Sequence, residues 1–293
     1  MKQHLLSLLF IALSLICLLS SKHGSAYASS KNMPNILIPK IQSTIKKYPN
    51  VICGIYVKTN CRRDNCININ GDSSFPAASL IKIPIAIVLL REIDKGKISW
   101  NENLTFKKHH LAQGTGVINT KKIETKIKLR QIFKLMLTIS DNTATNMIIE
   151  RLGGVSTTNK MISTLGIKNT KLVNWLGDFK GTNKTCPADL ALLLENSLEG
   201  DLLSKQSKKI FKNTLLGVKN KSLIKRGIGK HTKFAHKTGT IGISIGDAGI
   251  IYLPLGKRIT ISIMVKRPFN NLNGQAVIRE VSRLVYEYLK KSN

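Results

Sequence analysis

Carboxylates are scarce in this sequence of 293 residues, because 16 Asp and Glu stand against 46 Lys and Arg and give a formal net charge of +30. Such a balance favours anionic partners. The sequence also lacks a compact arginine-rich stretch or a basic stretch interleaved with aromatics, and this argues against nucleic acid as the partner. Two interpretations stay open: a basic surface that is simply solvated, and a surface that binds an anionic partner, which for an exported protein would be a cell-wall polymer or an anionic lipid surface.

Long apolar runs are absent after the first 28 residues, so no later segment is expected to span a bilayer. The start of the chain has the form of a secretory signal: Lys2, an apolar stretch from Leu5 to Leu19, and small residues at Ala26 and Ala28. We predict a signal peptide over 1–28, cleaved after Ala28, and a secreted or periplasmic protein. An uncleaved N-terminal anchor is the alternative.

Cysteine spacings typical of zinc sites are missing. Export permits disulfides, and Cys61 and Cys66 bracket a turn-like stretch that a bridge would close. Cys53 and Cys186 either pair or remain buried thiols.

Two neighbouring histidines, His109 and His110, carry no metal-binding pattern. Adjacent residues on a strand or helix point in different directions, so we expect both on the surface. The sequence therefore predicts no metal and no cofactor.

Internal repeats and low-complexity linkers are also absent, which favours one domain over 29–293. Hydrophobic periodicity predicts the following helices: 36–48, 79–97, 128–140, 141–154, 187–201 and 274–291. Strand-like runs lie near both ends of the chain: 51–59, 66–72, 234–242, 245–254 and 258–266. We expect an α/β (α+β) fold in which one antiparallel sheet, from about 29–74 and 233–293, carries an inserted helical lobe over about 75–232. We expect a monomer.

One apolar run, 75–86, holds a hydroxyl and an amine at Ser79 and Lys82. Residues three apart on a helix are neighbours, and a partly desolvated lysine can take the proton of a serine nucleophile. Backbone N–H groups at a helix N-terminus would also face a developing oxyanion. Taken alone, this spacing is common, and a helix start with a solvated lysine explains it equally well.

Two further stretches change this interpretation. Ser140, Asp141 and Asn142 follow a predicted buried helix, and Lys237 begins a K-T-G sequence in a predicted strand. S-x-x-K, S-D-N and K-T-G in this order form the signature of class A β-lactamases and penicillin-binding proteins. The flanking sequences 75–86, 129–153 and 236–254 are similar to class A sequences as well, so the resemblance covers nearly the whole mature chain.

The resemblance implies an acyl-enzyme reaction, with a β-lactam or a D-Ala-D-Ala stem peptide of peptidoglycan as substrate. Ser79 would attack the carbonyl carbon, Lys82 would take or relay its proton, and Ser140 would pass a proton to the leaving nitrogen. The backbone N–H groups of Ser79 and Thr240 would form the oxyanion hole.

Substrate binding is implied for four further residues. Asn142 would hold the acyl side-chain amide, and Lys237 with Thr238 would bind the substrate carboxylate. Gly239 would let its strand approach the ligand closely. Asp141 is expected to hold the loop in place and not to react.

The resemblance departs at one position. Class A enzymes hold the deacylating water with a glutamate that follows a tryptophan, and after Trp175 this sequence has Leu176. No glutamate occurs from 151 to 194, and Asp178 is the only carboxylate in the loop itself. Leucine cannot orient or deprotonate water, and general-base assistance contributes about 10²–10⁴-fold in rate.

The sequence therefore favours an exported penicillin-binding D-alanyl-D-alanine peptidase that lacks the deacylating glutamate. One alternative is a class A β-lactamase in which Asp178 replaces it. Another is a pseudoenzyme that binds cell-wall polymer, although the intact set of Ser79, Lys82, Ser140 and Lys237 argues against a pure binding protein.

Overall fold

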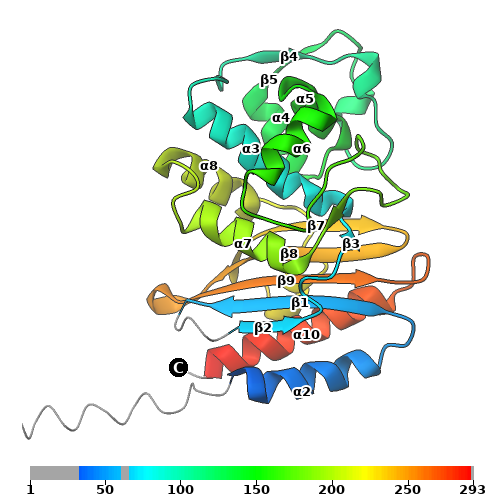
Figure 1. The fold of residues 1–293 in the computed structure, drawn as a ribbon, viewed down its shortest axis with the longest axis vertical. Helices are drawn as coiled ribbons and strands as arrows, with labels where there is room; N and C mark the ends of the chain where they lie inside the picture. Colours follow the sequence, from blue (N-terminus) through cyan, green and yellow to red (C-terminus); the bar gives the residue numbers. More distant parts are fainter. Residues whose placement is uncertain (1–32, 61–65, 292–293) are drawn as a thin grey trace, which may run out of the picture.

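The computed structural model describes residues 33–60 and 66–291 (Figure 1). The predicted signal peptide and Cys61 lie outside the described residues, so signal cleavage and the bridge from Cys61 to Cys66 stay predictions. Within the described ranges, no helix is long and apolar enough to cross a membrane.

A five-stranded antiparallel sheet forms the base of the molecule, in the order β2-β1-β9-β8-β7. Its strands come from both ends of the chain: β1 (Ile52–Thr59), β2 (Cys66–Ile69), β7 (Lys233–Ile241), β8 (Ser244–Tyr252) and β9 (Arg258–Lys266). β1 pairs with β9 and so joins the two ends. The predicted fold class is confirmed. β7 is an edge strand, so one side of its backbone is not paired within the sheet.

Two helices, α2 (Met33–Lys46) and α10 (Asn273–Lys291), cover one face of the sheet (Figure 1). The apolar stripe of α10 places Val277, Val281 and Val285 in a core shared with α2 and the sheet. This layer holds the sheet from the side opposite the helical lobe.

The helical lobe lies on the other side of the sheet (Figure 1). Its helices are α3 (Lys82–Asp94), α4 (Leu129–Thr138), α5 (Asn142–Arg151), α6 (Gly154–Ser163), α7 (Pro187–Leu198) and α8 (Lys205–Leu216). The short helix α9 (Ile224–Ile228), within the range predicted for this lobe, instead packs on α10 and shares the core of α2 and α10. Short strands pair as β3 (Phe75–Pro76) with β6 (Lys184–Thr185) and as β4 (Asn103–Thr105) with β5 (Lys126–Lys128). Single 3-10 turns are η3 (Ala78–Ile81), η4 (Lys108–His110), η5 (Ile118–Thr120) and η6 (Pro254–Gly256).

α3 is the central helix of this lobe, since every side chain from Ile83 to Leu90 is buried. The 3-10 turn η3 precedes it and carries Ser79, so the predicted single helix begins with a tighter turn. Pro84 lies in the first turn of α3, where a missing N–H costs little. The buried helix gives Ser79 and Lys82 a rigid base.

Gly239 allows β7 to pack directly on this turn. A Cβ atom added to Gly239 would lie 2.9 Å from Leu80 N and 3.0 Å from Ser79 N, which is too close for any side chain. The glycine therefore brings the edge strand against the backbone that carries Ser79, a contact with the protein itself that the sequence did not indicate.

Cys53 and Cys186 carry free thiols. Burial raises the pKa of Cys53 to about 12 and the pKa of Cys186 to about 11. Both stay protonated at neutral pH and act as small apolar side chains. Of the two interpretations of this pair, the buried thiols are the one that the structure supports.

Candidate active site

Lys82 lies at the centre of a group of polar side chains between the two lobes. Its side chain is fully buried, and Nζ lies 3.1 Å from Ser79 Oγ. Nζ also donates to the carbonyl oxygen of Ser140 at 2.6 Å and to Asn142 Oδ1 at 2.7 Å. A buried amine needs such acceptors to offset the loss of water. The network holds Nζ against the Ser79 hydroxyl.

Lys237 approaches the same centre from β7. Its Nζ donates to Ser140 Oγ at 3.0 Å and to the carbonyl oxygen of Thr238 at 2.7 Å. The Ser140 hydroxyl lies 3.1 Å from Lys82 Nζ, so it bridges the two lysines. Ser140 has a φ of 62°, in the left-handed region that non-glycine residues rarely adopt. Such strain is often retained at functional sites.

Burial shapes the electrostatics of both amines. Burial, followed by the charge of Lys237, holds the pKa of Lys82 well below its ordinary value. Burial lowers the pKa of Lys237 to about 7, although the charge of Asp247 opposes this shift. A neutral Lys82 beside Ser79 can act as a base, and a protonated Lys237 can bind an anion.

Asp141 holds the loop that forms one wall of the site. As predicted, it does not contact Ser79 but caps α5, where its carboxylate accepts from Ala144 N at 2.8 Å. The carboxylate also accepts from the N–H groups of Val117 and Ile118, and Gly116 packs against it. These contacts hold the segment that precedes Val117.

Neighbouring residues of that segment reach the site directly. Thr115 Oγ1 donates to the carbonyl oxygen of Ser140 at 2.7 Å, and Asn142 N donates to the carbonyl oxygen of Thr115. The side-chain amide of Asn142 donates to the carbonyl oxygen of Gln113 at 2.8 Å. Asn142 is thus oriented at both ends, toward Lys82 and toward Gln113.

The polar group opens into a cleft of about 240 Å³. It is lined by predicted site residues and by others: Ser79, Thr115, Thr138, Ile139, Ser140, Val218, Lys219, Asn220, Lys237, Thr238 and Thr240. No carboxylate lines this cleft, so it suits an anionic substrate. Lys219 and Asn220 were not predicted, because they lie in a loop without a motif.

Asp247 is a second residue that sequence reasoning missed. It is fully buried on β8 opposite Thr238, and its carboxylate contacts His236 Nδ1 at 2.8 Å and Ile224 N at 3.1 Å. The signal was a carboxylate inside an otherwise apolar strand-like run. The pair of His236 and Asp247 lies behind Lys237 and affects its charge.

Leu176 lies in the loop between α6 and α7, 6% exposed and packed into the larger apolar core. Its backbone is held at both ends by one side chain: Leu176 N donates to Asn146 Oδ1 at 2.9 Å, and Asn146 Nδ2 donates to Leu176 O at 2.6 Å. The peptide bond between Leu176 and Gly177 is cis. The position predicted for a water-activating glutamate thus holds a buried apolar side chain.

Both carboxylate oxygens of Asp178 accept hydrogen bonds from residues of the same loop. One carboxylate oxygen accepts from Thr182 Oγ1 at 2.8 Å and the other accepts from Asn183 N at 2.7 Å. This geometry is that of a turn-stabilising carboxylate. It gives no support to Asp178 as a substitute base.

His109 is exposed, as predicted, but His110 is buried, and the two imidazole rings do not point apart: both approach Glu150. The reason is that both lie in the 3-10 turn η4, which turns their rings toward the end of α5. His110 Nδ1 accepts from Lys107 N at 3.1 Å, so the Nε2 that faces Glu150 carries the proton in the neutral ring. A protonated nitrogen cannot ligate a metal, and the contacts are those of hydrogen bonds.

The fold and the polar group together define a serine hydrolase of the β-lactamase and penicillin-binding class. The Beta-lactamase enzyme family matches residues 36–289, and the chain belongs to this family.

Two known proteins illustrate the similarity. β-Lactamase VEB-1 of Pseudomonas aeruginosa is 28% identical, over 94% of this chain and 96% of that protein. The structure of PBP-A superposes with a TM-score of 0.83 at 39% identity, over 87% of this chain and 96% of that chain. A leucine-to-glutamate variant of PBP-A, described as an acyl-enzyme complex with penicillin G, gives a TM-score of 0.84 at 39% identity, over 88% of this chain and 97% of that chain.

The double hydrogen bond from Asn146 should control the order of the loop around Leu176. Replacing Asn146 by Ala leaves a buried N–H and a buried C=O without partners, and each such group costs about 1–3 kcal/mol. We expect a free energy of unfolding lower by about 2–4 kcal/mol in urea titration, and faster tryptic cleavage after Lys180. Asn174→Ala, in the exposed part of the same loop, is the control. Equal cleavage rates in the Asn146 variant and the wild type would contradict this role.

Proposed function

We propose that this protein is an exported penicillin-binding D-alanyl-D-alanine peptidase whose β-lactam adduct is long-lived. The observation that carries the proposal is Leu176, buried where a class A β-lactamase needs a glutamate. Asp178, the nearest alternative, is bound within its own loop. Acylation has its full set of groups, and deacylation lacks its base.

Acylation follows from the contacts around Lys82. The neutral amine accepts the proton of the Ser79 hydroxyl as Oγ forms a bond to the substrate carbonyl carbon. The oxyanion then lies near the N–H groups of Ser79 and Thr240, and one such donor contributes about 10²–10³ in rate. As the carbon–nitrogen bond breaks, Ser140 passes a proton to the leaving nitrogen and regains one from the lysines beside it.

Binding of the substrate uses the opposite side of the cleft. The protonated amine of Lys237 and the hydroxyl of Thr238 receive the substrate carboxylate, at the end of the cleft where Ser140 also lies. Asn142 presents its amide to the acyl side chain. β7 supports this arrangement, because its free edge can pair with an extended peptide.

The similarity to known proteins supports the same assignment. PBP-A, a penicillin-binding protein by name, shares 39% identity with this chain, and β-lactamase VEB-1 shares 28%. A leucine-to-glutamate variant of PBP-A is described as an acyl-enzyme complex with penicillin G, the kind of adduct that we propose for Ser79. The full-length similarity to VEB-1 keeps an antibiotic-hydrolysing β-lactamase as the second candidate.

The peptidase assignment predicts release of D-alanine from a diacetyl-L-lysyl-D-alanyl-D-alanine peptide. The Ser79→Ala variant should release none, because the nucleophile is missing. D-alanine is measured by a coupled oxidase assay, in parallel with hydrolysis of a chromogenic cephalosporin. Rapid cephalosporin turnover without release of D-alanine would favour the second candidate.

Leu176→Glu should accelerate deacylation, because it restores a carboxylate beside the acyl-enzyme. We expect release of the penicilloyl group to become about 10²-fold faster, at the lower end of what a general base supplies. Leu176→Gln serves as the control, because glutamine has nearly the size of glutamate but cannot act as a base. If both variants release the adduct at the wild-type rate, the loop has been placed incorrectly.

The pH dependence of acylation should be bell-shaped, because Lys82 must be neutral and Lys237 protonated. The rate rises as pH increases through the lowered pKa of Lys82 and falls as pH passes the Lys237 pKa of about 7. The charge of Asp247 raises the pKa of Lys237, so Asp247→Asn should move the alkaline limb to lower pH. Stopped-flow acylation across pH measures this shift, with the exposed Asp201→Asn as control. An unchanged limb would contradict the assignment.

A further inference from the structure

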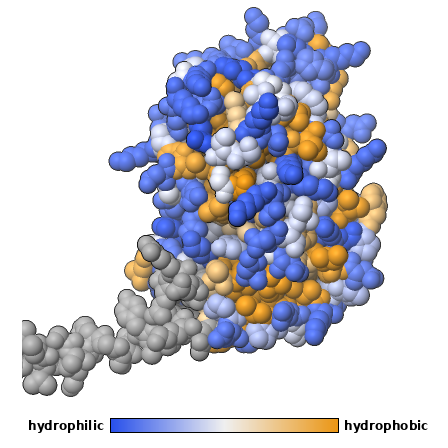
Figure 2. Space-filling view, viewed as in Figure 1, coloured by the Kyte–Doolittle hydropathy of each residue, from blue (hydrophilic) through white to orange (hydrophobic). Residues whose placement is uncertain are grey.

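Four exposed apolar side chains gather at one end of the sheet. Phe269 is 78% exposed, Leu272 70%, Ile52 59% and Ile243 39%. We call these four residues the end-of-sheet surface. Figure 2 shows apolar colour at the right-hand edge of the molecule, where Figure 1 places the loop between β9 and α10. Exposed apolar patches that are surrounded by polar residues often mark sites where a protein binds another protein or a membrane.

Strand register brings the four residues together from distant parts of the chain. Lys266, at the end of β9, lies opposite Ile52 in β1 and opposite Ser244 in β8. The start of β1, the turn between β7 and β8, and the loop after β9 are therefore neighbours. Asn273 also donates to the carbonyl oxygen of Pro49, which joins that loop to the turn before β1.

The loop that carries Phe269 and Leu272 is held firmly. Asn270 N donates to the carbonyl oxygen of Gly242 at 2.9 Å, and Arg267 N donates to that of Ile243 at 3.0 Å. The Phe269 ring lies over Gly242, where a side chain of any size would collide with it. The apolar side chains are thus held in the solvent by a fixed backbone. Their exposure does not stabilise the fold, because apolar surface in water is unfavourable.

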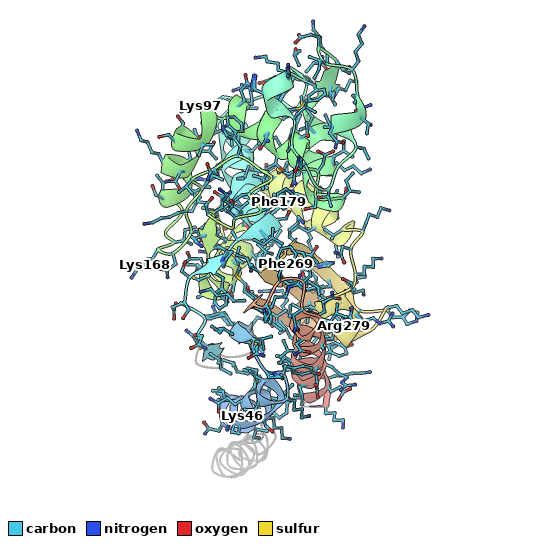
Figure 3. The ribbon with its side chains drawn as sticks, turned by 90° about the vertical axis from the view of Figure 1, so that its right-hand side faces the viewer. Lys46, Lys97, Lys168, Phe179, Phe269 and Arg279 are labelled. Carbon is cyan, nitrogen blue, oxygen red and sulfur yellow. The ribbon has the colours of Figure 1, made fainter. Side chains whose placement is uncertain are left out.

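The surroundings of this surface are basic. The segments that carry it, 46–54, 241–246 and 266–276, hold Lys46, Lys47, Lys266 and Arg267 and no carboxylate. Residues 33–60 contain no carboxylate at all. Figure 3 shows Lys46, at the end of α2, on the same side of the molecule as Phe269. Fixed apolar side chains amid positive charge are the two features that bind peripheral proteins to anionic membranes.

We propose that the end-of-sheet surface docks on an anionic lipid bilayer, with Phe269 and Leu272 inserted at the headgroup level. Exposed lysines near them, such as Lys46, contact lipid phosphates. This attachment is peripheral and reversible, because it uses two side chains and surface charge. It would hold the active site close to the membrane without a spanning helix.

The test is cosedimentation of the protein with phosphatidylcholine vesicles that contain or lack phosphatidylglycerol. We expect the wild type to bind the anionic vesicles, and added salt to weaken the binding. The double variant Phe269→Ser/Leu272→Ser should bind anionic vesicles at least about tenfold more weakly than the wild type, since it can no longer bury these two apolar side chains in the bilayer. Leu255→Ser is the matched control: Leu255 is 92% exposed, but it lies alone in η6 at the other end of the sheet. Unchanged penicillin acylation shows that the variants are folded.

Four outcomes would overturn the proposal. The first is that the wild type is not recovered with anionic vesicles. The second is that the double variant binds them as tightly as the wild type does. Binding to purified peptidoglycan without binding to vesicles would assign the surface to the wall polymer. A wild-type dimer that the double substitution converts to a monomer, again without vesicle binding, would make the surface a self-association interface.

Discussion

The structure depends on a single buried amine. Lys82 is fully buried between Ser79, Ser140 and Asn142, and hydrogen bonds to these residues offset the cost of its burial. α3 supplies the rigid base, and β7 brings Lys237 to the other side of the Ser140 hydroxyl. Burial is the main cause that lowers the pKa of Lys82, and the charge of Lys237 adds to it, so Lys82 is prepared to act as a base.

Under the proposed function, the loop between α6 and α7 decides what happens after acylation. In this chain the buried residues of the loop stabilise the fold. Leu176 packs in the core, Asn146 hydrogen-bonds to the backbone of Leu176, and Asp178 stabilises a turn. The same fold can therefore retain the chemistry that forms an acyl-enzyme and omit the chemistry that hydrolyses it. A glutamate at position 176 would lose the apolar packing of Leu176 and would add a carboxylate that can act as a base.

Much of this could be predicted from the sequence, because short motifs and strong periodicity report local chemistry. The Ser79 and Lys82 pair, the role of Asp141 in holding its loop and the sheet built from both ends of the chain followed from them. Long-range contacts did not follow. The approach of His110 to Glu150 depends on a turn that brings residues forty positions apart together, and the pairing of Asp247 with His236 depends on the register of β7 and β8. Asp247 stands out in the sequence as a carboxylate in an apolar run, but nothing in the local sequence indicates the partner of either carboxylate.

The central claim is that Ser79 is acylated readily and deacylated slowly. The most direct measurement follows the intact mass of the protein over time after a brief exposure to penicillin G and removal of the free antibiotic. We predict a single penicilloyl adduct, absent in the Ser79→Ala variant, that persists for minutes or longer. An adduct that disappears within seconds while free penicilloic acid accumulates would contradict the account.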